Sequence, residues 1–567
     1  MSIPTALFKS RRGREATASA RYAVRRAGGA VTSLMARRSS GKMGPGRFLP
    51  KRRPLAAGSS LMARTSGRSG AGQILLRLRR DEDRLSALPD DLLLLILRRL
   101  DTRSAFGTGL LSKRWVHLAR EVAALDVRVG DMLPPRYHRC VLLYSDARGK
   151  GNVRHGLLPN IWRYERCAMR AFTSSTESLL EGPRRMVSRL RLEFIVTANA
   201  GGINQLIAEA IDAWGVEYLE AVAKPTFNRR DGIHKFPSHG LCKEPCASHL
   251  RSLKLGGCVL PPLHEYSTLS MLVLKDIPEL TPVAAYEGIF TLCLKLQTLH
   301  LISCGCSSGD GISLTLVADA PGSEIRELVV ENCTFRRLWL KALPCLERLA
   351  SGSRVLFESS SFPCLKQRNL TIRQGIEVEG LGQRPKVELD TYLQWTPDIT
   401  DLIIRFTGPY RWIVPSRSPS AFLPNLRRLL VADVPSSWDV TWPRLLLEIA
   451  PSLESLHIHI AHCKLGLGAE INWPPTKLQH HHLNEFVVAG FKGTARQIYL
   501  VKFVVRACKA LCHVAMFKNG YAQSKGHWDW EMVAQQHLWT DEEKENMLKQ
   551  IMDRVPSSTA PVQLVLG

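Results

Sequence analysis

Six consecutive apolar residues, Leu92 to Leu97, constrain this 567-residue chain more than any other feature. They lie inside the stretch DRLSALPDDLLLLILRRLDTRSAFGTGLLSKRW, which runs from Asp83 to Trp115. Pro89 suits the first position of a helix, and Asp90 and Asp91 suit its positive end. Because a helix turns by about 100° per residue, the apolar run covers every face of this helix. The sequence therefore predicts a helix that must be covered on all sides.

Two further short helices are expected directly after the first. Asp101 and Ser112 are suitable N-caps for them, and Gly107 and Gly109 should fray or bend the second helix, since each costs about 1 kcal/mol relative to Ala. A module of roughly 40 residues can cover little of its own apolar surface. The apolar run is far shorter than the ~20 residues of a membrane span. We expect a partner protein to cover the first helix; the alternative is that the domain that follows covers it.

The order of short motifs in this stretch resembles the plant F-box. The matching segments are Asp83–Ser86, Leu88–Asp90, Leu92–Leu100 and Leu110–Trp115. The resemblance implies that the module docks onto a Skp-type adaptor, which joins F-box proteins to a cullin-based ubiquitin ligase. The residues that it assigns to the adaptor interface, with the tryptophan as a helix anchor, are Leu88, Pro89, Leu92, Ile96, Leu100, Leu110, Leu111 and Trp115.

The positive charge of the chain is concentrated at its start. Residues 1–80 hold 19 Lys or Arg and one acid, a net charge of +18 of the chain's +26, which leaves +8 for the rest. This leader lacks a hydrophobic period, so we expect it to be disordered. It suits a transit peptide, a basic arm for nucleic acid or nuclear import, or no specific role. Because few aromatic residues are present to stack bases, we do not expect nucleic acid as a partner.

The body of the chain has the composition of a cytoplasmic or nuclear protein. No apolar run is long enough to span a bilayer, so we expect no membrane partner and a soluble body. The fourteen cysteines, none before Cys140, follow no disulfide framework, and no secretory signal is evident. We therefore expect reduced, mostly buried thiols.

An apolar-x-x-Leu-x-apolar pattern recurs from about residue 187, mostly ~20–30 residues apart, as in leucine-rich repeats. The pattern occurs at 187–192, 216–221, 250–255, 269–274, 296–301, 325–330, 399–404, 426–431, 453–458 and 483–488, the last with Phe in place of Leu. Cys258, Cys304 and Cys333 follow three of these copies, where the repeat turns inward. One copy cannot bury its apolar face alone, so stacked copies are expected to form a solenoid with a curved parallel sheet. The gap at 350–398 should hold degenerate repeats.

The solvent-facing positions of the repeat strands are candidates for holding a protein substrate. They carry both signs of charge, so they do not select an acidic or a basic partner. The candidate residues are Arg251, Lys254, His300, Asp401, Arg427, Arg428 and His457.

No catalytic constellation or cofactor motif is evident, so we expect neither an enzyme nor a cofactor. Three cysteine groups lack the paired spacing of a structural zinc site: Cys304 and Cys306 with His300, Cys242 with Cys246, and Cys508 with Cys512 and His513. We expect no metal site there. The run His480–His482 is expected on a solvated loop.

The end of the chain resembles the FBD region of plant F-box/leucine-rich-repeat proteins. The matching residues are His482–Phe486, Gly490–Gly493 and Arg496–Gln497, followed by an apolar helix from Ile498 to Leu511. The pattern predicts a strand, a turn at Gly490–Gly493, this helix and a strand at 514–517. A helix that starts near Thr540 and a strand at 562–566 should follow. We expect this region to cap the solenoid, with substrate contact as the alternative.

These observations predict an α/β fold, in which a three-helix F-box precedes a leucine-rich-repeat solenoid. The expected division is 1–80 leader, 81–127 F-box, 128–186 linker and start of the solenoid with a helix around 164–172, 187–482 repeats, and 483–567 FBD-like cap. The expected function is a non-catalytic substrate adaptor of a Skp–cullin–F-box ubiquitin ligase. The alternatives are a leucine-rich interaction protein outside any ligase, and a nucleic-acid-associated protein that acts through the leader.

Overall fold

The described part of the chain lies within the second of its two compact units, Asp81–Gly567. The computed structural model describes residues 85, 87–181, 186–196, 201–229, 232–263, 266, 268–307, 314–358, 362–373, 387–388, 393, 398–407, 413–414, 422–463, 478–535, 539–553 and 563–567. The predicted basic leader, residues 1–80, lies outside these ranges, as does Ser86 of the F-box motif.

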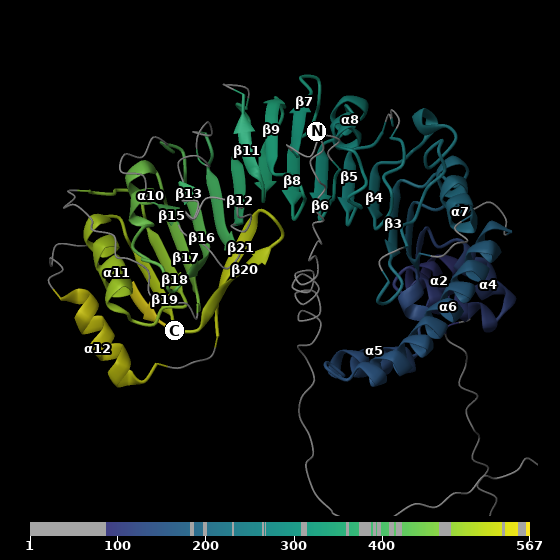
Figure 1. Ribbon diagram of the computed structural model, residues 1–567, viewed down its shortest axis with the longest axis horizontal. Coiled ribbons are helices and arrows are strands. Elements are labelled where there is room, and N and C mark those ends of the chain that lie inside the picture. Colours follow the sequence, from purple (N-terminus) through teal and green to yellow (C-terminus); the bar gives the residue numbers. More distant parts are fainter. Residues whose placement is uncertain are drawn as a thin grey trace, which may run out of the picture. The chain divides into compact units, whose positions relative to one another are not determined.

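A fifteen-stranded parallel sheet dominates this unit, and its strands follow one another in chain order (Figure 1). Its strands are β1 (Ala124–Arg128), β2 (Arg189–Ile195), β3 (Tyr218–Lys224), β4 (Ser252–Gly256), β5 (Met271–Lys275), β6 (Thr298–Ile302), β8 (Glu327–Glu331), β10 (Arg348–Ser351), β12 (Gln367–Arg373), β14 (Asp401–Thr407), β16 (Arg428–Pro435), β17 (Ser455–Ala461), β18 (Glu485–Ala489), β19 (His513–Phe517) and β22 (Gln563–Leu566). Each of the ten predicted pattern positions ends on one of these strands. The predicted strands and their parallel order are therefore confirmed.

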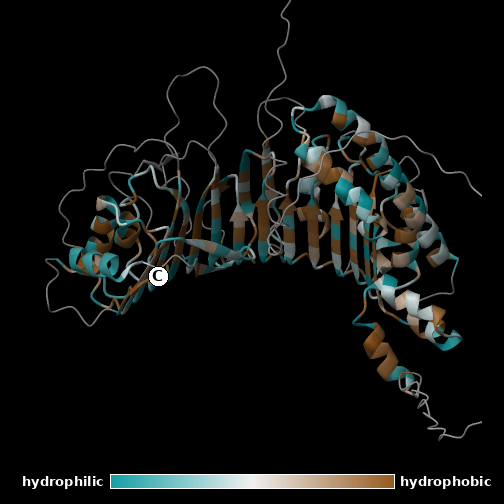
Figure 2. Cartoon of the chain, turned by 90° about the horizontal axis from the view of Figure 1, so that it is seen from below, coloured by the Kyte–Doolittle hydropathy of each residue, from teal (hydrophilic) through white to brown (hydrophobic). Residues whose placement is uncertain are grey.

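The leucines of the pattern form a continuous buried row across the sheet. Leu253, Leu272 and Leu299 are register neighbours on β4, β5 and β6, and all three are fully buried. Side chains alternate between the two faces of a strand, so the pattern places one face of every strand in a single core. We call this the core face, and the opposite side the outer face. Figure 2 shows the alternation as hydrophobic and hydrophilic bands along the strands.

One position of this buried row is occupied by an arginine. Arg368 on β12 lies in register between Leu349 and Leu402. Its guanidinium stands over the ring of Phe357 at 5.2 Å, and burial lowers its pKa to about 9. The predicted degenerate stretch thus includes strands β10 and β12 of the same sheet.

The core face is covered by connecting helices and by a second, three-stranded parallel sheet. These helices are α7 (Gly201–Asp212), α8 (Val283–Leu292), α10 (Arg444–Ile449) and α11 (Ala495–Ala507), and the strands are β7 (Thr315–Asp319), β9 (Arg337–Ala342) and β11 (Arg354–Phe357). Parallel strands need crossover connections, which these elements supply. The short pair β13 (Val387–Glu388) and β15 (Ile413–Val414) forms a separate sheet.

Several strands end at a residue in the left-handed conformation, which turns the chain away from the sheet. Gly257, Asp276, Ser303, Asn332 and Gly490 follow β4, β5, β6, β8 and β18, with φ between 52° and 76°. Gly490 has a second constraint, because a Cβ there would lie 2.1 Å from the carbonyl oxygen of Ile460. Only glycine fits such a close approach without a shift of the backbone.

Three cysteines occupy the position directly after this turn, where Cys258 and Cys304 are buried and Cys333 is partly buried. The Cys304 thiol lies 3.4 Å from the carbonyl oxygen of Leu274, and the Cys333 thiol 3.3 Å from that of Leu301. Cys258 is buried at the corresponding position of β4. The predicted inward position of these three cysteines is confirmed.

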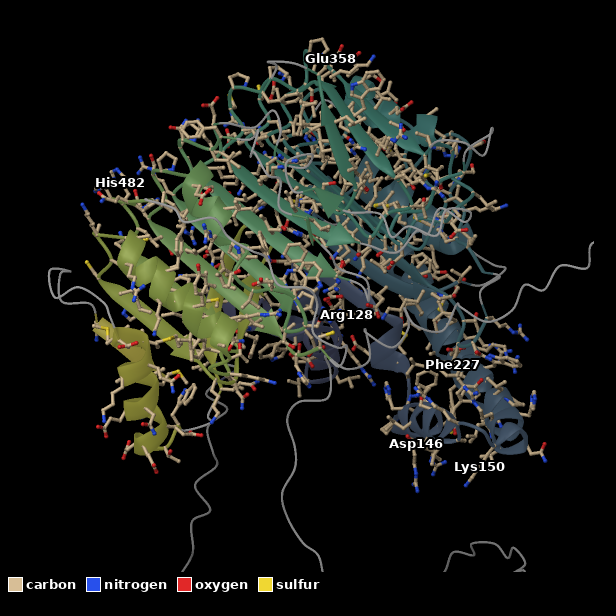
Figure 3. All side chains as sticks on the ribbon, turned by 60° about the vertical axis from the view of Figure 1, so that its left-hand side comes forward. Arg128, Asp146, Lys150, Phe227, Glu358 and His482 are labelled. Carbon is tan, nitrogen blue, oxygen red and sulfur yellow. The ribbon has the colours of Figure 1, made fainter. Side chains whose placement is uncertain are left out.

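Residues 128–186, assigned from the sequence to a linker with a helix near 164–172, are largely helical. They contain the 3₁₀ helix η3 (Val129–Met132), α5 (Pro135–Asp146) and the 30-residue α6 (Gly151–Leu180). The two helices share a small apolar cluster with Phe227, whose carbonyl oxygen accepts a 2.8 Å hydrogen bond from the Trp162 indole. Figure 3 labels Asp146 and Lys150 in the turn between these helices. Because polar and apolar residues are mixed in this stretch, the sequence did not predict the full length of α6.

The C-terminal prediction is confirmed in its elements and incomplete in one respect. Strands β18, β19 and β22, helix α11 and helix α12 (Asp541–Met552) lie where the pattern placed them, and α12 begins with a capping box between Thr540 and Glu543. The sequence analysis missed an antiparallel hairpin, β20 (Gly520–Lys525) and β21 (Asp529–Ala534). This hairpin, in yellow, lies across the strands of the main sheet in Figure 1.

Candidate functional site: an apolar helix and a covered sheet face

Three short helices follow one another at the start of the described chain. They are α2 (Asp90–Leu97), α3 (Thr102–Gly107) with the 3₁₀ helix η2 (Thr108–Leu110), and α4 (Lys113–Arg120). Asp101 accepts a 2.9 Å hydrogen bond from the Ser104 N–H, and Ser112 accepts one from the Trp115 N–H, so both predicted caps are confirmed. Pro89 is the N-cap of α2 and not its first residue, a shift of one position.

Helix α2 buries one stripe and exposes the rest. Leu93 and Leu97 are fully buried in a small cluster with Ala105, Trp115 and Leu118. Residues at i and i+4 share a helix face, which explains this pair. The chain leaves the opposite side open, with side chains at three positions more than a third exposed: Leu92 (45%), Leu95 (53%) and Ile96 (38%). In Figure 2, α2 is the strongly hydrophobic helix at the lower right.

Helix η2 adds two leucines to this open surface. Leu110 is 94% exposed and Leu111 is 69% exposed. A Cβ on Gly109 would lie 3.1 Å from Cγ2 of Val116, so the small residue permits close packing of η2 on α4. The helix around the glycines therefore shortens and passes into a 3₁₀ turn, in line with the expected irregularity.

The eight residues that the F-box resemblance assigns to the adaptor divide into two groups. Trp115 is buried and holds α4 to α2, and Leu88 packs partly against the same cluster. The exposed members are Pro89, Leu92, Ile96, Leu100, Leu110 and Leu111. An exposed apolar surface of this size marks an interaction site.

An ion pair fixes the relative position of the first and last helices. The Arg114 guanidinium lies 2.6 Å from Oδ1 of Asp90 and donates a 2.6 Å hydrogen bond to the carbonyl oxygen of Leu88. The long side chain thus ties the start of α4 to the start of α2, and it keeps the exposed leucines on one framework.

The three helices join the sheet through α3. Thr102 Oγ1 accepts a 2.7 Å hydrogen bond from the Asp126 N–H on β1, and Arg103 donates one of 2.8 Å to the carbonyl oxygen of Asp131. The buried residues of α2 form a cluster separate from the sheet core. The alternative in which the following domain covers α2 is therefore wrong for its exposed leucines.

The outer face of the first strands of the sheet carries alternating charges. Glu220 lies 3.3 Å from Arg191 Nε and 2.9 Å from the Lys254 ammonium. Arg251, at the edge before β4, lies 3.7 Å from Glu217. The candidates Arg251 and Lys254 therefore stand in an exposed network of ion pairs, where each pair contributes little to stability.

The β20–β21 hairpin packs on the outer face of the later strands. Ala522 and Trp530 form an apolar cluster with Ile403, Leu430 and Ala432 of β14 and β16. Polar contacts surround this cluster. They are Asp529 Oδ1 to Arg428 Nη2 (2.8 Å), Ser524 Oγ to Arg405 Nη2 (2.8 Å) and Trp530 Nε1 to His457 Nδ1 (2.7 Å).

The tip of the hairpin reaches toward the middle of the sheet. The carbonyl oxygen of His527 accepts a 2.7 Å hydrogen bond from the Asn369 side chain. Nδ1 of the His527 ring lies 3.2 Å from Oε1 of Glu331. The His300 and His527 rings meet edge to face, with centroids 5.2 Å apart. The hydrogen bond to Glu331 raises the pKa of His527.

Some of the predicted substrate residues contact the hairpin, and others do not. Arg428 and His457 contact it directly, and His300 contacts its tip while its Nε2 lies 2.6 Å from Glu327. Asp401 lies beneath them, 3.2 Å from Arg428. Arg427 points to the sheet edge with its side chain 65% exposed, 3.6 Å from Glu454. The expectation that all these positions face solvent is wrong for His300, Asp401 and His457, whose side chains are about 15% exposed.

His457 is the most connected of these residues. Its Nδ1 accepts the Trp530 indole N–H, and its Nε2 lies 3.1 Å from Glu485. The hydrogen bond from His457 lowers the pKa of Glu485 to about 2. The sequence did not predict Trp530 as a partner of His457 or Asp529 as a partner of Arg428, because only the fold brings β21 to β16 and β17.

The histidine run at 480–482 is not uniformly solvated. His480 is buried, with Nε2 3.0 Å from the carbonyl oxygen of Ala450 and Nδ1 accepting the Leu483 N–H at 3.1 Å. Burial lowers its pKa. His481 and His482 are exposed, and Figure 3 labels His482 at the surface. The prediction for His480 is therefore wrong, since its ring is buried between the segments that contain Ala450 and Leu483.

Within the described ranges, no group of three or more His, Cys, Asp or Glu side chains is placed to hold a metal ion. Burial raises the pKa of Cys242 to about 11 and that of Cys508 to about 12. Among the helices of the described residues, none is both long and apolar enough to cross a bilayer.

The comparison with protein families matches the three-helix module. The family model of the F-box domain covers residues 85–123, which include α2, α3, η2 and α4. No curated protein matches the chain. In general, F-box domains bind Skp-type adaptors in cullin-based ubiquitin ligases. The chain therefore carries an F-box domain at residues 85–123.

Proposed function

We propose that this chain is a substrate-recruiting subunit of a Skp–cullin–F-box ubiquitin ligase. The observation that carries the proposal is the open leucine surface of α2 and η2 within the matched domain. It includes the residues Leu92, Ile96 and Leu110, which the resemblance assigns to the adaptor and which are all more than a third exposed. A Skp-type adaptor would cover this surface and connect the chain to a cullin.

The long sheet would serve as the substrate-binding part. In this proposal the sheet is a leucine-rich-repeat solenoid, with residues 187–482 as its repeats and 483–567 as its FBD-like cap. The buried leucine row and the left-handed turn after several strands support a repeat origin. The finding that α5 and α6 occupy 128–186 makes this stretch a helical insertion after β1, where the sequence suggested a linker.

The proposed role is non-catalytic. F-box proteins act by positioning, since holding a substrate near the transferring enzyme raises its effective concentration. The work would take place in the cytoplasm or the nucleus. The substrate would be a protein, held by outer-face residues such as Arg251 and Lys254.

A stepwise reconstitution tests the ligase role. The full chain, a Skp-type adaptor and the N-terminal part of a cullin are mixed in pairs and together, and complexes are separated by size. We expect the chain to co-elute with the cullin only when the adaptor is present. Leu142→Asp with Leu143→Asp is a matched control, because these exposed leucines lie on α5, outside the F-box domain. A folded chain that joins no adaptor would instead act as a binding module outside any ligase.

A further inference from the structure

The outer face that would receive a substrate is occupied by the chain's own β20–β21 hairpin. We propose that this part of the sheet is a binding site for an extended segment of a partner protein, and that the hairpin is its detachable occupant. The inference rests on the proposed function only in taking the partner to be a protein substrate. The residues of this site, called the hairpin site below, are Asn369, Ile403, Arg405, Arg428, Leu430 and His457.

The hairpin site has a defined chemical preference. His457 Nδ1 accepts an indole N–H, and Arg428 pairs with a carboxylate while its guanidinium lies 4.5 Å from the Trp530 ring centroid. Ile403 and Leu430 form an apolar floor between these polar groups. The partner that fits is a β-extended segment with an acidic residue next to a tryptophan, as Asp529 and Trp530 are in the hairpin.

The hairpin is attached in a way that allows release. It forms a two-stranded sheet of its own and pairs with no strand of the main sheet among the described residues. An isolated two-stranded ribbon is marginally stable, so this one depends on its packing against the outer face. Its apolar contacts form a cluster separate from the main core, so release would leave the leucine row intact.

The charged contact between the hairpin and Arg428 is exposed at its rim. The side chains of Arg428 and Asp529 are 43% and 55% exposed, and exposed ion pairs of this kind are individually weak. A competing segment with the same chemistry can therefore replace them one by one. Tethering gives the hairpin a high effective concentration, so a partner must bind more tightly than the hairpin or bind where the hairpin has lifted.

The test offers the hairpin to the sheet as a separate peptide. In the full chain, residues 520–534 are replaced by a Gly-Ser linker of equal length, and the probe is a labelled peptide of residues 518–535. We expect the linker variant to bind the peptide at least about tenfold more tightly than the wild type, whose own hairpin competes. Adding Arg428→Ala to the linker variant should weaken the peptide about fivefold or more.

An arginine outside the hairpin site is the matched control. Arg326→Ala in the linker variant should leave peptide binding unchanged, since Arg326 lies directly before β8 and pairs with Glu347. Equal losses with Arg326→Ala and Arg428→Ala would overturn the proposal. So would a linker variant that keeps its thermal midpoint yet binds no peptide.

Hydrogen exchange of the wild type keeps the proposal testable if the linker variant does not fold. We expect amides of 520–534 to exchange earlier than those of β18 and β19, whereas equal protection would show a permanent part of the core and overturn the proposal. Adaptor binding is measured on the same samples. If the samples bind the peptide but not the adaptor, the ligase role is contradicted and the hairpin site is not. If they bind the adaptor but not the peptide, the hairpin site is contradicted and the ligase role is not.

Discussion

The indole N–H of Trp530 donates a 2.7 Å hydrogen bond to Nδ1 of His457, a residue 73 positions earlier in the chain. This contact fixes the tautomer of His457, whose other nitrogen then faces Glu485 at 3.1 Å. It joins the hairpin to strand β17 at the centre of the surface that the sequence assigned to a substrate. The same bond therefore stabilises the hairpin and withholds His457 from any other partner.

Removing this hydrogen bond should loosen the hairpin without unfolding the sheet. Trp530→Phe keeps most of the apolar contact with Leu430 and should lower the free energy of hairpin opening by about 1 kcal/mol. Hydrogen exchange of residues 520–534 measures this opening. Tyr521→Phe is the control, because Tyr521 lies on the exposed side of β20. Unchanged exchange in Trp530→Phe would show that the bond contributes nothing to closure.

Gly490→Ala should destabilise the sheet. Gly490 has φ of +76°, and the new Cβ would stand 2.1 Å from the carbonyl oxygen of Ile460. We expect a loss of more than about 1 kcal/mol of unfolding free energy, read as a lower denaturation midpoint. Gly322→Ala is the control, since a Cβ there meets nothing within 4 Å. Equal midpoints for the two variants would contradict the proposed strain.

The tip of the hairpin should hold less firmly as the pH rises. The hydrogen bond to Glu331 raises the pKa of His527, so this contribution is complete below the ordinary imidazole pKa of about 6.5 and is lost as the pH passes the raised value. Glu331 lies 3.2 Å from the ring, the His300 ring lies 5.2 Å away, and Glu327 adds a further negative charge.

Hydrogen exchange of the tip, corrected for intrinsic rates, should therefore show more protection near about pH 6 than near about pH 9. His527→Gln should remove most of this difference. A pH dependence that is the same in wild type and variant would assign it to another group. Greater protection at high pH would reverse the predicted sign.

The strands could be predicted from the sequence because their signal is local. The spacing of Leu269, Leu272 and Leu274 alone places one strand face in a core, and the pattern recurs often enough to set the order of the sheet. The cap at Asp101 and the helix start near Thr540 are likewise local signals, and both are confirmed. The exposed leucines of α2 could be predicted as well, because the apolar run from Leu92 to Leu97 covers all faces of the helix and a small module cannot bury them all.

The hairpin could not be predicted in the same way. Its place depends on contacts such as that between Asn369 and His527, which are 158 residues apart. In strand β21, Trp530 and Met532 lie on the packed side and alternate with charged residues. This alternation is too short to be told from a loop by sequence alone. Helix α5 and the full length of α6 were missed for a related reason, because their apolar cluster is completed by Phe227 from a distant loop.

Docking of the adaptor on α2 is tested by calorimetric titration of a Skp-type adaptor into the wild-type chain and into a double variant, Leu92→Asp with Ile96→Asp. Both side chains are exposed on α2, whereas Leu93 and Leu97 carry the packing, so the variant should keep its thermal midpoint. We expect the wild type to bind and the variant to bind at least about 100-fold more weakly, because two apolar side chains are lost from the interface. A folded wild type that does not bind, or a variant that binds equally well, would contradict the F-box surface as the docking site.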